Sequence, residues 1–338
     1  MVSIKTIAEE CGVSIATVSK SLNGHKDISE TTRNFVCETA KRLGYMPNSQ
    51  ARALKTNKSY IIGVLLADKA ENGLTHVYFS AVIDSFKREM EKSGYDIVFI
   101  SEKIGDRTMS FYEHCLYRNV DGVLAACVDF ESNGVQGLIK SSVPLVAIDY
   151  KQKGLCSVVS DNRNGMSDLV NYIYSLGHRR IAYIYGDDSQ VTSSRVTAYI
   201  DTLKMLGINH DENYLKHGKY LDCTSAEILT HDLMKLPSPP TCIIYPDDYC
   251  AISGLEVIKK YAEANPFGKI SVAGYDGLLA GRIKSLSLTT VKQDTYSIGT
   301  NAGRLLKRII AKEDIPEDEM VSVVRGFLVN GQTVGTMP

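Results

Sequence analysis

Three aspartates and one arginine are the residues whose chemistry first suggests a binding site. Asp149, Asp247 and Asp276 each come just after an apolar run typical of a strand, and Arg195 begins the helical stretch that follows the run 181–185. Ligands of open parallel sheets bind at the carboxyl ends of the strands, so we expect these side chains to meet in one cleft. Carboxylates accept pairs of hydroxyl hydrogens and a guanidinium donates in a fork, which suits a polyhydroxylated ligand.

Two other roles are open to these four residues. Polar side chains after strands often cap the next helix or satisfy loop backbone, and this is the competing interpretation for each of them. Glycosidases use two carboxylates as acid and base, but only at a defined separation, which a sequence does not give. The chain has no Gly-x-Ser-x-Gly elbow and no Walker phosphate loop. We therefore expect no catalytic residues and no enzyme.

The eight cysteines and seven histidines show no metal-binding pattern. There is no Cys-x-x-Cys pair and no His-Glu-x-x-His motif, so we expect buried thiols, no disulfide framework, no metal site and no cofactor. Residues 1–5 run into polar positions without a signal segment, and no later stretch has the apolar length of a membrane span. These features predict a cytoplasmic protein that does not bind a membrane.

Charge is distributed unevenly between the two ends of the chain. Residues 1–60 contain nine Lys or Arg and five Asp or Glu, a charge of +4. Because the net charge of the whole chain is −1, the remaining residues carry a charge of −5. A basic segment on an acidic body is typical of a nucleic-acid-binding unit joined to a different kind of domain. The length of 338 residues also favours two or three folding units.

Three short helical patterns fill the first 46 residues. Thr6 and Glu9 have the spacing of a capping box for the first helix, which Gly12 should end. Ser14 and Ser29 can cap the second and third helices. Three short helices with a tight turn between the first two predict a helix-turn-helix unit.

Two further segments follow this unit. The segment 47–59 has helix-forming residues for barely two turns, which is too short to hold a helix alone in water, so it reads as a conditional linker. From Tyr60 onward, apolar strand-like runs alternate with amphipathic helical stretches, and the alternation restarts after residue 160. This pattern predicts parallel α/β structure in two doubly wound lobes.

The predicted fold is an N-terminal all-α helix-turn-helix head followed by an α/β effector domain of two doubly wound parallel-sheet lobes. The predicted domains are the head at 1–46, a hinge helix or linker at 47–59, and a ligand-binding and dimerisation domain at 60–338. Within the last domain, we expect an N-lobe at about 60–160 plus 292–320 and a C-lobe at about 161–291 plus 321–338.

Motifs along nearly the whole chain resemble those of the lac-repressor (LacI/GalR) family. In the head and linker they are residues 4–20, Leu22-Asn-Gly24, Ser29-x-x-Thr-Arg33, Leu43-Gly-Tyr-x-Pro-Asn48 and Ala51-Arg-x-Leu54. Downstream they are Val159–Gly165, Leu176–Ala182, Ser194-Arg195, Gly274-Tyr-Asp276 and Leu288–Asp294. The resemblance implies a DNA-binding head and an effector domain that is similar to periplasmic sugar-binding proteins.

The resemblance places the second helix of the head in the major groove of DNA. Ile15 and Ala16 are then expected to touch thymine methyl groups, and Lys20 to donate to guanine. The other residues of the head that we expect at the DNA, mostly for phosphate contacts that fix the register, are Thr6, Ser14, Thr17, Ser19 and Asn23. A helix-turn-helix used only for protein contact is the alternative.

The linker carries a second DNA-binding prediction. In the family, two hinge helices of a dimer lie in the minor groove, and a leucine at the position of Leu54 wedges between the central base pairs and kinks the DNA. Ala51 and Lys55 lie beside it in the sequence and are predicted to join this contact. A leucine that is merely buried in a short helix is the competing interpretation.

In the effector domain, the resemblance adds aromatic walls to the predicted ligand site. Tyr78, Phe79 and Tyr220 occupy positions where relatives place such walls, and Asp247 stands where relatives often have Asn. The ligand-binding residues that we predict are therefore Tyr78, Phe79, Asp149, Arg195, Tyr220, Asp247 and Asp276. The effector implied is a small molecule, most simply a sugar; a purine or a phosphocarrier protein partner are the alternatives within the family.

These expectations combine into one mechanism. A homodimer formed through the effector domains sets two heads on a pseudo-palindromic, double-stranded operator, and ligand between the lobes changes how the hinges pair. The chain is then a transcriptional regulator, most simply a repressor, and the sequence leaves open whether the ligand releases or strengthens DNA binding. A sugar-binding module without regulation is the rival class, which the helix-turn-helix head argues against.

Overall fold

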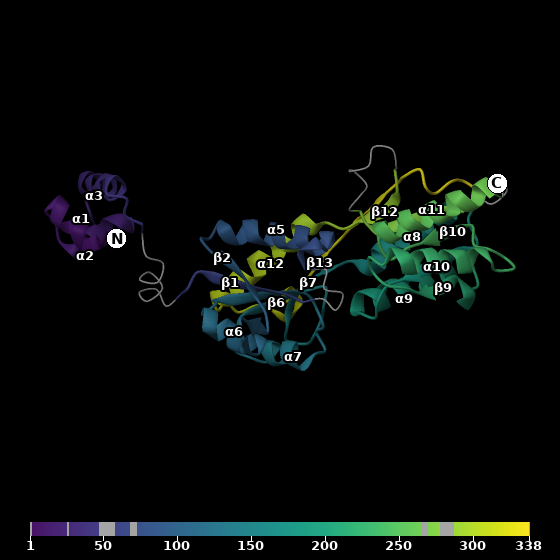
Figure 1. Ribbon diagram of the computed structural model, residues 1–338, viewed down its shortest axis with the longest axis horizontal. Coiled ribbons are helices and arrows are strands. Elements are labelled where there is room, and N and C mark those ends of the chain that lie inside the picture. The colour runs from purple at the N-terminus through teal and green to yellow at the C-terminus, as the bar shows by residue number, and fades with distance from the viewer. Residues whose placement is uncertain are drawn as a thin grey trace. The chain divides into compact units, whose positions relative to one another are not determined.

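The computed structural model describes residues 2–25, 27–46, 58–67, 73–264, 270–277 and 287–337. The chain divides into two compact units, Met1–Ser59 and Tyr60–Pro338 (Figure 1). No helix among these described residues is long and apolar enough to cross a membrane.

The described part of the first unit is a bundle of three short helices. They are α1 (Ile4–Cys11), α2 (Ile15–Leu22) and α3 (Glu30–Arg42). Ser14 and Ser29 cap α2 and α3 as predicted, each by accepting a hydrogen bond from the backbone amide three residues on. The small core consists of buried apolar residues from all three helices, Ile7, Ala8, Val18, Val36 and Ala40.

The first helix begins one turn earlier than the sequence indicated. Ser3, and not Thr6, is its N-cap, and Thr6 is the third helical residue, whose hydroxyl closes the capping box on Ser3. The earlier start is favoured because it brings Ile4 against the core of the unit. Gly12 ends α1 with a φ of +63°, a left-handed conformation that glycine adopts at little cost, so the chain can turn sharply into α2.

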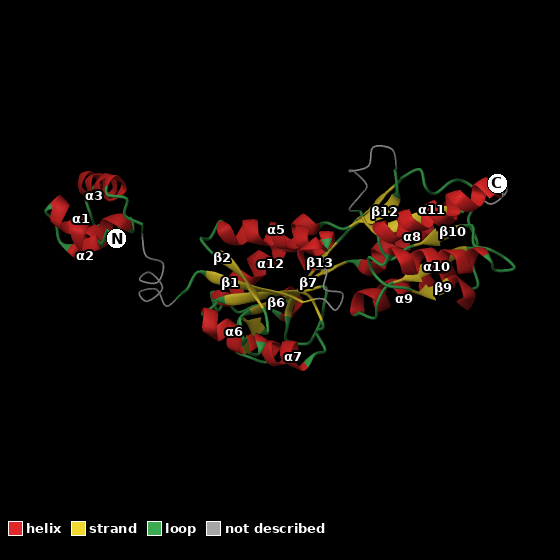
Figure 2. Ribbon diagram, in the orientation of Figure 1, coloured by secondary structure: helices red, strands yellow, loops and turns green. Residues whose placement is uncertain are grey.

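The second unit contains two six-stranded sheets, each with helices on both faces (Figure 2). In the first lobe, the strand order is β13 (Val321–Val324), β7 (Cys156–Ser160), β6 (Leu145–Ile148), β5 (Gly122–Val128), β1 (Ile61–Ala67) and β2 (Asp96–Ile100). All five pairings are parallel. Its helices are α5 (Val77–Glu91), α6 (Phe111–Arg118), α7 (Asn133–Ile139) and α12 (Thr295–Ile310).

The second lobe repeats this architecture. Its strand order is β14 (Phe327–Val329), β12 (Thr289–Lys292), β11 (Ser271–Asp276), β10 (Cys242–Ile244), β8 (Ile181–Tyr185) and β9 (Leu215–His217), with only β14 antiparallel. Its helices are α8 (Asn162–Ser175), α9 (Gln190–Met205), α10 (Cys223–Met234) and α11 (Asp248–Ala264). Minor elements are the hairpin β3 (Lys103–Ile104) and β4 (Arg107–Thr108) and the 3-10 turns Gly73–Thr75, Glu212–Tyr214 and Glu317–Glu319.

Each sheet is buried on both faces because its strands are apolar at successive positions. In β5, Leu124 and Ala126 pack under α5 and α12, while Val123 and Ala125 pack against α6 and α7. The second lobe divides in the same way between α8 and α9 on one face and α10 and α11 on the other. The predicted fold class, a helix-turn-helix head followed by two doubly wound lobes, is confirmed.

The described chain passes between the lobes three times: after β7, after β12 and after β13. The last crossing differs from the expected lobe boundary at about 320. Val321–Val324 still belong to the first sheet, because they pair in parallel with β7 at Ser157–Ser160, and the chain enters the second lobe only at β14. A short edge strand cannot be assigned to one of two similar sheets from its own sequence.

Helices α5 and α12 lie side by side over the first sheet although they are about two hundred residues apart in the chain (Figure 1). A Cβ at Gly299 would come within 2.3 Å of the carbonyl oxygen of Val82, so only glycine allows this approach. About two turns further along both helices, Glu89 is buried and its carboxylate accepts from Lys307 at 2.7 Å and from Lys92 at 2.8 Å. Hydrogen bonds from these ammonium groups lower the pKa of Glu89 from 4.5 to about 2.

This contact predicts a pH-dependent stability. Because the folded-state pKa of Glu89 lies below its ordinary value, its contribution is complete above about pH 4.5 and is lost as the pH falls through about 2. We expect Glu89→Gln to lower the free energy of unfolding by about 2 kcal/mol at pH 7, and the difference from wild type to shrink below pH 4.5. Urea unfolding at several pH values measures it, with the exposed Glu91→Gln as a matched control that should change little.

Candidate functional site

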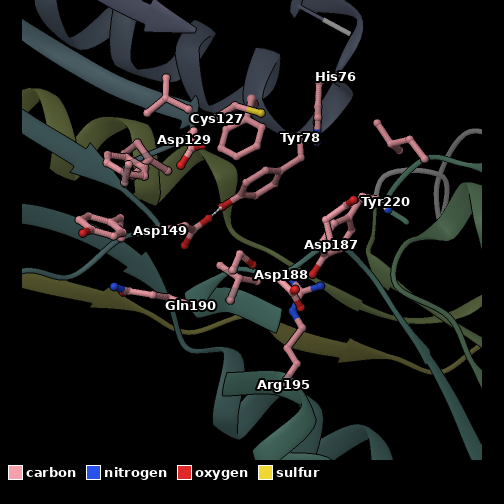
Figure 3. A pocket seen from close by; sticks show the side chains of 18 of the residues that line it. His76, Tyr78, Cys127, Asp129, Asp149, Asp187, Asp188, Gln190, Arg195 and Tyr220 are labelled. Carbon is pink, nitrogen blue, oxygen red and sulfur yellow. Dashed lines mark hydrogen bonds between the residues drawn. The ribbon is translucent and has the colours of Figure 1, made fainter. Parts of the chain in front are cut away.

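A cavity of about 520 Å³ lies between the two lobes of the second unit (Figure 3). Lining residues of the first lobe lie within 76–79, 127–131 and 148–150, and those of the second lobe lie within 187–195 and 217–221 and include Asp276; Gln293 also lines the cavity. Six of the seven predicted ligand residues are in its wall: Tyr78, Phe79, Asp149, Arg195, Tyr220 and Asp276. The cavity is within the usual range for small-molecule sites.

Strand ends position the polar residues of the cavity, as the sequence indicated. Asp149 follows β6 directly, and Asp276 is the last residue of β11. Asp149, Asp276 and Cys127 at the end of β5 have left-handed backbone, with φ of 56°, 92° and 53°. Such φ values cost of order 1–3 kcal/mol for residues other than glycine and cluster at functional sites. Three residues with such φ values line this one cavity, so the surrounding fold holds the backbone of the wall in a conformation that is locally unfavourable.

Asp149 is held from both sides. The hydroxyl of Tyr78 donates to one carboxylate oxygen at 2.5 Å, and the backbone amide of Ser160 donates to the other at 2.8 Å. Burial raises the pKa of Asp149, although both hydrogen bonds act in the opposite direction. Burial and the neighbouring carboxylate also raise the pKa of Tyr78 well above its usual value, so the phenol remains protonated and keeps donating.

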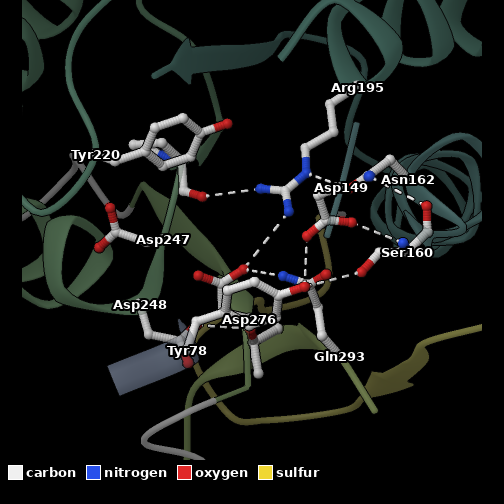
Figure 4. A network of polar contacts seen from close by, with 12 residues as sticks. Tyr78, Asp149, Ser160, Asn162, Arg195, Tyr220, Asp247, Asp248, Asp276 and Gln293 are labelled. Carbon is white, nitrogen blue, oxygen red and sulfur yellow. Dashed lines mark hydrogen bonds and ion pairs between the residues drawn. The ribbon is translucent and has the colours of Figure 1, made fainter. Parts of the chain in front are cut away.

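Arg195 and Asp276 form a buried ion pair in the second lobe (Figure 4). The guanidinium is 3% exposed and lies 3.5 Å from the carboxylate. It also donates to the Asn162 side chain at 2.8 Å and to the Pro246 carbonyl at 3.3 Å, and it stacks on Tyr275 at 3.6 Å.

The position of Arg195 in its helix differs from the expected one. Helix α9 is capped by Ser189 and starts at Gln190, five residues before Arg195, where the helical stretch was expected to begin. Arg195 therefore projects from the second turn rather than from the helix end. The cap explains the shift, because Ser189 accepts from the amide of Thr192.

Gln293 joins this network at the crossing between β12 and α12. Its amide nitrogen donates to Asp276 at 2.5 Å, while its carbonyl oxygen is buried and has no partner among the described residues. Burial raises the pKa of Asp276 to about 6, with Arg195 acting against that shift. Gln293 was not predicted as a site residue, although it lies in the quoted motif Leu288–Asp294.

Asp247 lies apart from the other predicted ligand residues. It is fully buried but does not line the cavity. One oxygen accepts from the backbone amide of Cys250 at 2.9 Å, in the first turn of α11, and the other accepts from the amide of Leu221 at 2.8 Å. The helix-capping interpretation describes this residue, because it immediately precedes α11 and backbone donors occupy both of its oxygens.

In the first unit, helix α2 presents the side chains predicted to face DNA. Ile15 is 53% exposed, unusual for an isoleucine, and Ala16 beside it is exposed as well. Lys20 is also exposed and forms an ion pair with Asp27 at 2.5 Å. Ser14 is occupied as the helix cap, and the Asn23 amide donates to the Ser19 carbonyl at 2.6 Å.

The remaining head and linker predictions divide between described and undescribed positions. Thr6 is exposed, and Thr17 is half-buried with its hydroxyl 2.9 Å from that of Ser14. Ala51, Leu54 and Lys55, predicted to contact DNA through the hinge, lie outside the described residues.

Comparisons with known proteins agree with this architecture. Residues 3–48 match the family model of bacterial regulatory proteins, lacI family, and residues 170–334 match that of the periplasmic binding protein-like domain. The HTH-type transcriptional repressor PurR of Vibrio atlanticus (strain LGP32) is 27% identical, with full coverage of both chains. The chain therefore carries a lacI-family helix-turn-helix domain joined to a periplasmic-binding-like domain.

Solved structures share the fold over the whole chain. A lac repressor dimer bound to operator and the anti-inducer ONPF has a TM-score of 0.80 at 22% identity and covers 99% of each chain. A complex of the transcriptional regulator CelR with cellobiose has a TM-score of 0.70 at 22% identity, covering 98% of this chain and 100% of that one.

Aromatic rings also line the cavity. Tyr78 and Phe79 meet edge to face at 4.9 Å, and Phe130 stacks on Tyr150 at 4.2 Å with an interplanar angle of 3°. Tyr220 is fixed by its hydroxyl, 2.9 Å from that of Thr192.

Several cavity residues escaped the sequence analysis. Phe130, Asp129 and Glu131 follow β5, and Asp187 and Asp188 follow β8. The rule that identified Asp149, a polar residue just after a strand, also applies to these two loops and would have found the four acidic residues, but not Phe130. No group of three or more metal-ligating side chains occurs within the described part of the chain.

The Tyr78–Asp149 contact generates a test by double-mutant cycle. Tyr78→Phe removes a donor from a buried carboxylate, and we expect it to lower the free energy of unfolding by about 1–3 kcal/mol at pH 7. In an Asp149→Asn background the same change should cost clearly less, because no charge is left without its donor. Because the pKa of Asp149 is raised, the cost should fall as the pH is lowered and the carboxyl becomes neutral. Equal costs in both backgrounds would contradict the assignment.

Proposed function

We propose that this chain is a lacI-family transcriptional repressor whose operator affinity is controlled by a sugar bound between its two lobes. The observation that carries the proposal is the buried polar set of the cavity, in which Arg195 and the two carboxylates Asp149 and Asp276 converge from two lobes. A guanidinium fork and several carboxylate oxygens match the hydroxyls of a sugar. The CelR–cellobiose complex, which has the same fold, supports this choice of ligand.

A sugar is favoured over a purine by the composition of the wall. The aromatic pairs would stack on the apolar faces of a sugar ring or a base equally well. The polar groups discriminate, because carboxylates accept hydrogen bonds and hydroxyl-rich ligands offer many donors. A phosphocarrier protein as effector would leave the cavity unused. A purine therefore remains the second candidate for the ligand.

At the DNA, the proposed complex is a homodimer on a pseudo-palindromic, double-stranded operator. Helix α2 of each head enters the major groove, where the exposed Ile15 and Ala16 touch thymine methyls and Lys20 reaches a guanine. The proposed phosphate contacts involve Thr6, Ser14, Thr17, Ser19 and Asn23. Residues Ala51, Leu54 and Lys55 of both copies meet in the minor groove at the operator centre.

The first experiment measures fluorescence anisotropy of the full-length protein on a library of symmetric operators, with and without a panel of sugars, at one fixed salt concentration. We expect sequence-selective binding that Leu54→Ala weakens, and a sugar-dependent shift in affinity that is lost in Arg195→Ala. The sign of the shift identifies the sugar as inducer or corepressor. Circular dichroism of Arg195→Ala checks that loss of the response is not loss of the fold.

Two results would contradict this proposal in different ways. Absence of selective DNA binding would refute the regulator. Selective binding that no sugar changes would leave a DNA-binding protein with another effector, and the same assay with purines would then test the second candidate.

The ion pair of Lys20 with Asp27 gives a separate prediction for the head. In free protein the carboxylate holds the lysine that is proposed to reach guanine, so DNA must displace it. We expect Asp27→Asn to raise operator affinity severalfold at low salt, with a smaller gain at high salt because exposed charges are screened. The matched control is Glu10→Gln, which removes the same charge from the exposed Glu10–Arg42 pair between α1 and α3. An equal gain in both variants would mean that only net charge matters.

A further inference from the structure

The charge of the cavity wall is strongly one-sided. Its described lining contains six carboxylates and a single Lys or Arg, which is Arg195. The carboxylates are Asp129, Glu131, Asp149, Asp187, Asp188 and Asp276. Even if Arg195 and Asp276 are counted as a neutral pair, five acidic side chains remain around one site. The field of such a cavity attracts cations and repels anions, because low-dielectric walls focus it.

Arg195 is not available to compensate an anionic ligand. Its guanidinium faces Asp276, and it also donates to Asn162 and to the Pro246 carbonyl. One face of the group lies against the ring of Tyr275. A phosphate or a second carboxylate would have to compete with Asp276 for a charge that is already matched, in a site where desolvating an anion is expensive.

The inner wall also offers an acceptor that has no donor. Gln293 lines the cavity, and its carbonyl oxygen, which is buried from solvent, has no hydrogen-bond partner among the described residues. Its amide cannot simply be turned around, because the nitrogen donates to Asp276 at 2.5 Å. A buried acceptor left unpaired costs about 1–3 kcal/mol, so a rearrangement that exposed it to a ligand would favour a donor, a hydroxyl or an ammonium. A carboxylate or phosphate oxygen would worsen the mismatch.

Two acidic residues extend the preference for uncharged or cationic ligands to the solvent-exposed part of the wall. Asp187 and Asp188 are both exposed at the loop between β8 and α9, and both line the cavity. One oxygen of Asp187 accepts from the amide of Tyr220 at 3.2 Å, so that carboxylate is held in place beside the aromatic wall. A ligand that enters past these residues experiences their charge before it reaches Arg195.

We infer that the cavity selects an uncharged or cationic hydroxylated ligand, a neutral sugar or an amino sugar, and excludes sugar acids and sugar phosphates. The inference rests on the proposed sugar-controlled function and narrows its ligand class. It joins three independent features of the wall: the excess of carboxylates, the guanidinium that is already paired, and the buried acceptor of Gln293.

Isothermal titration of the full-length protein with matched sugar sets tests the inference. Each set contains a neutral sugar, its amino derivative, its uronic acid and its 6-phosphate, beginning with the glucose and galactose series and adding cellobiose as a neutral disaccharide. In any series that binds, we expect the neutral or amino member to bind about tenfold or more tightly than the acid and the phosphate. An acid or phosphate that binds more tightly than its neutral parent would overturn the inference while leaving a sugar-controlled protein. No binding by any sugar would refute the proposed function, and the inference with it.

A pair of charge variants separates the field of the cavity from general surface charge. Asp188→Lys adds a cation to the cavity wall, and we expect it to reduce the discrimination against the uronic acid about threefold to tenfold. Glu256→Lys makes the same change of charge at an exposed position of α11 that does not line the cavity, and it should leave the discrimination unchanged. Equal discrimination in both variants and wild type would overturn the electrostatic argument.

Discussion

The guanidinium of Arg195 is almost entirely buried, and the residues around it in the cavity wall supply the opposite charge and the hydrogen-bond acceptors that it needs. An unmatched charge in such a place would cost several kcal/mol, so its partners must be fixed and not merely close. Asp276 supplies the opposite charge, Asn162 and the Pro246 carbonyl each accept from one N–H group of the guanidinium, and Tyr275 covers one face. These partners come from three segments of the second lobe, so the ion pair ties the lobe together at the cavity.

The same burial explains the unusual state of the carboxyl groups nearby. Desolvation raises the pKa of Asp149 and Asp276, and hydrogen bonds from Tyr78, Ser160 and Gln293 limit the shift without removing it. The backbone at both aspartates is left-handed, which the surrounding sheet must enforce. A site with strained backbone and incompletely satisfied polar atoms is less stable than an apolar core would be. A complementary ligand can supply the missing interactions. The free energy that this binding releases can then favour a different conformation elsewhere in the chain.

The head is stabilised differently from the lobes. Within its described residues the core has only five buried apolar side chains and the three helices are short, so serine caps and the glycine at the turn contribute a large share of its stability. This small core does not cover Ile15 and Ala16 of α2, which face solvent. Those apolar side chains are unfavourable in water, and a partner surface that covers them offsets this cost.

Elements that depend on local interactions could be predicted from the sequence alone. The caps at Ser14 and Ser29, the turn at Gly12 and the alternation of strands and helices were readable because each depends on residues a few positions apart. The strand-end rule found Asp149 and Asp276, and motif resemblance found Tyr78, Phe79 and Tyr220. Three other outcomes depend on tertiary contacts. Asp247 caps α11 instead of lining the cavity, Val321–Val324 complete the first sheet, and Gln293 keeps an unpaired acceptor. The physical reason is that these outcomes depend on which distant groups compete for the same hydrogen bond or sheet edge, and a sequence records the competing groups without their distances.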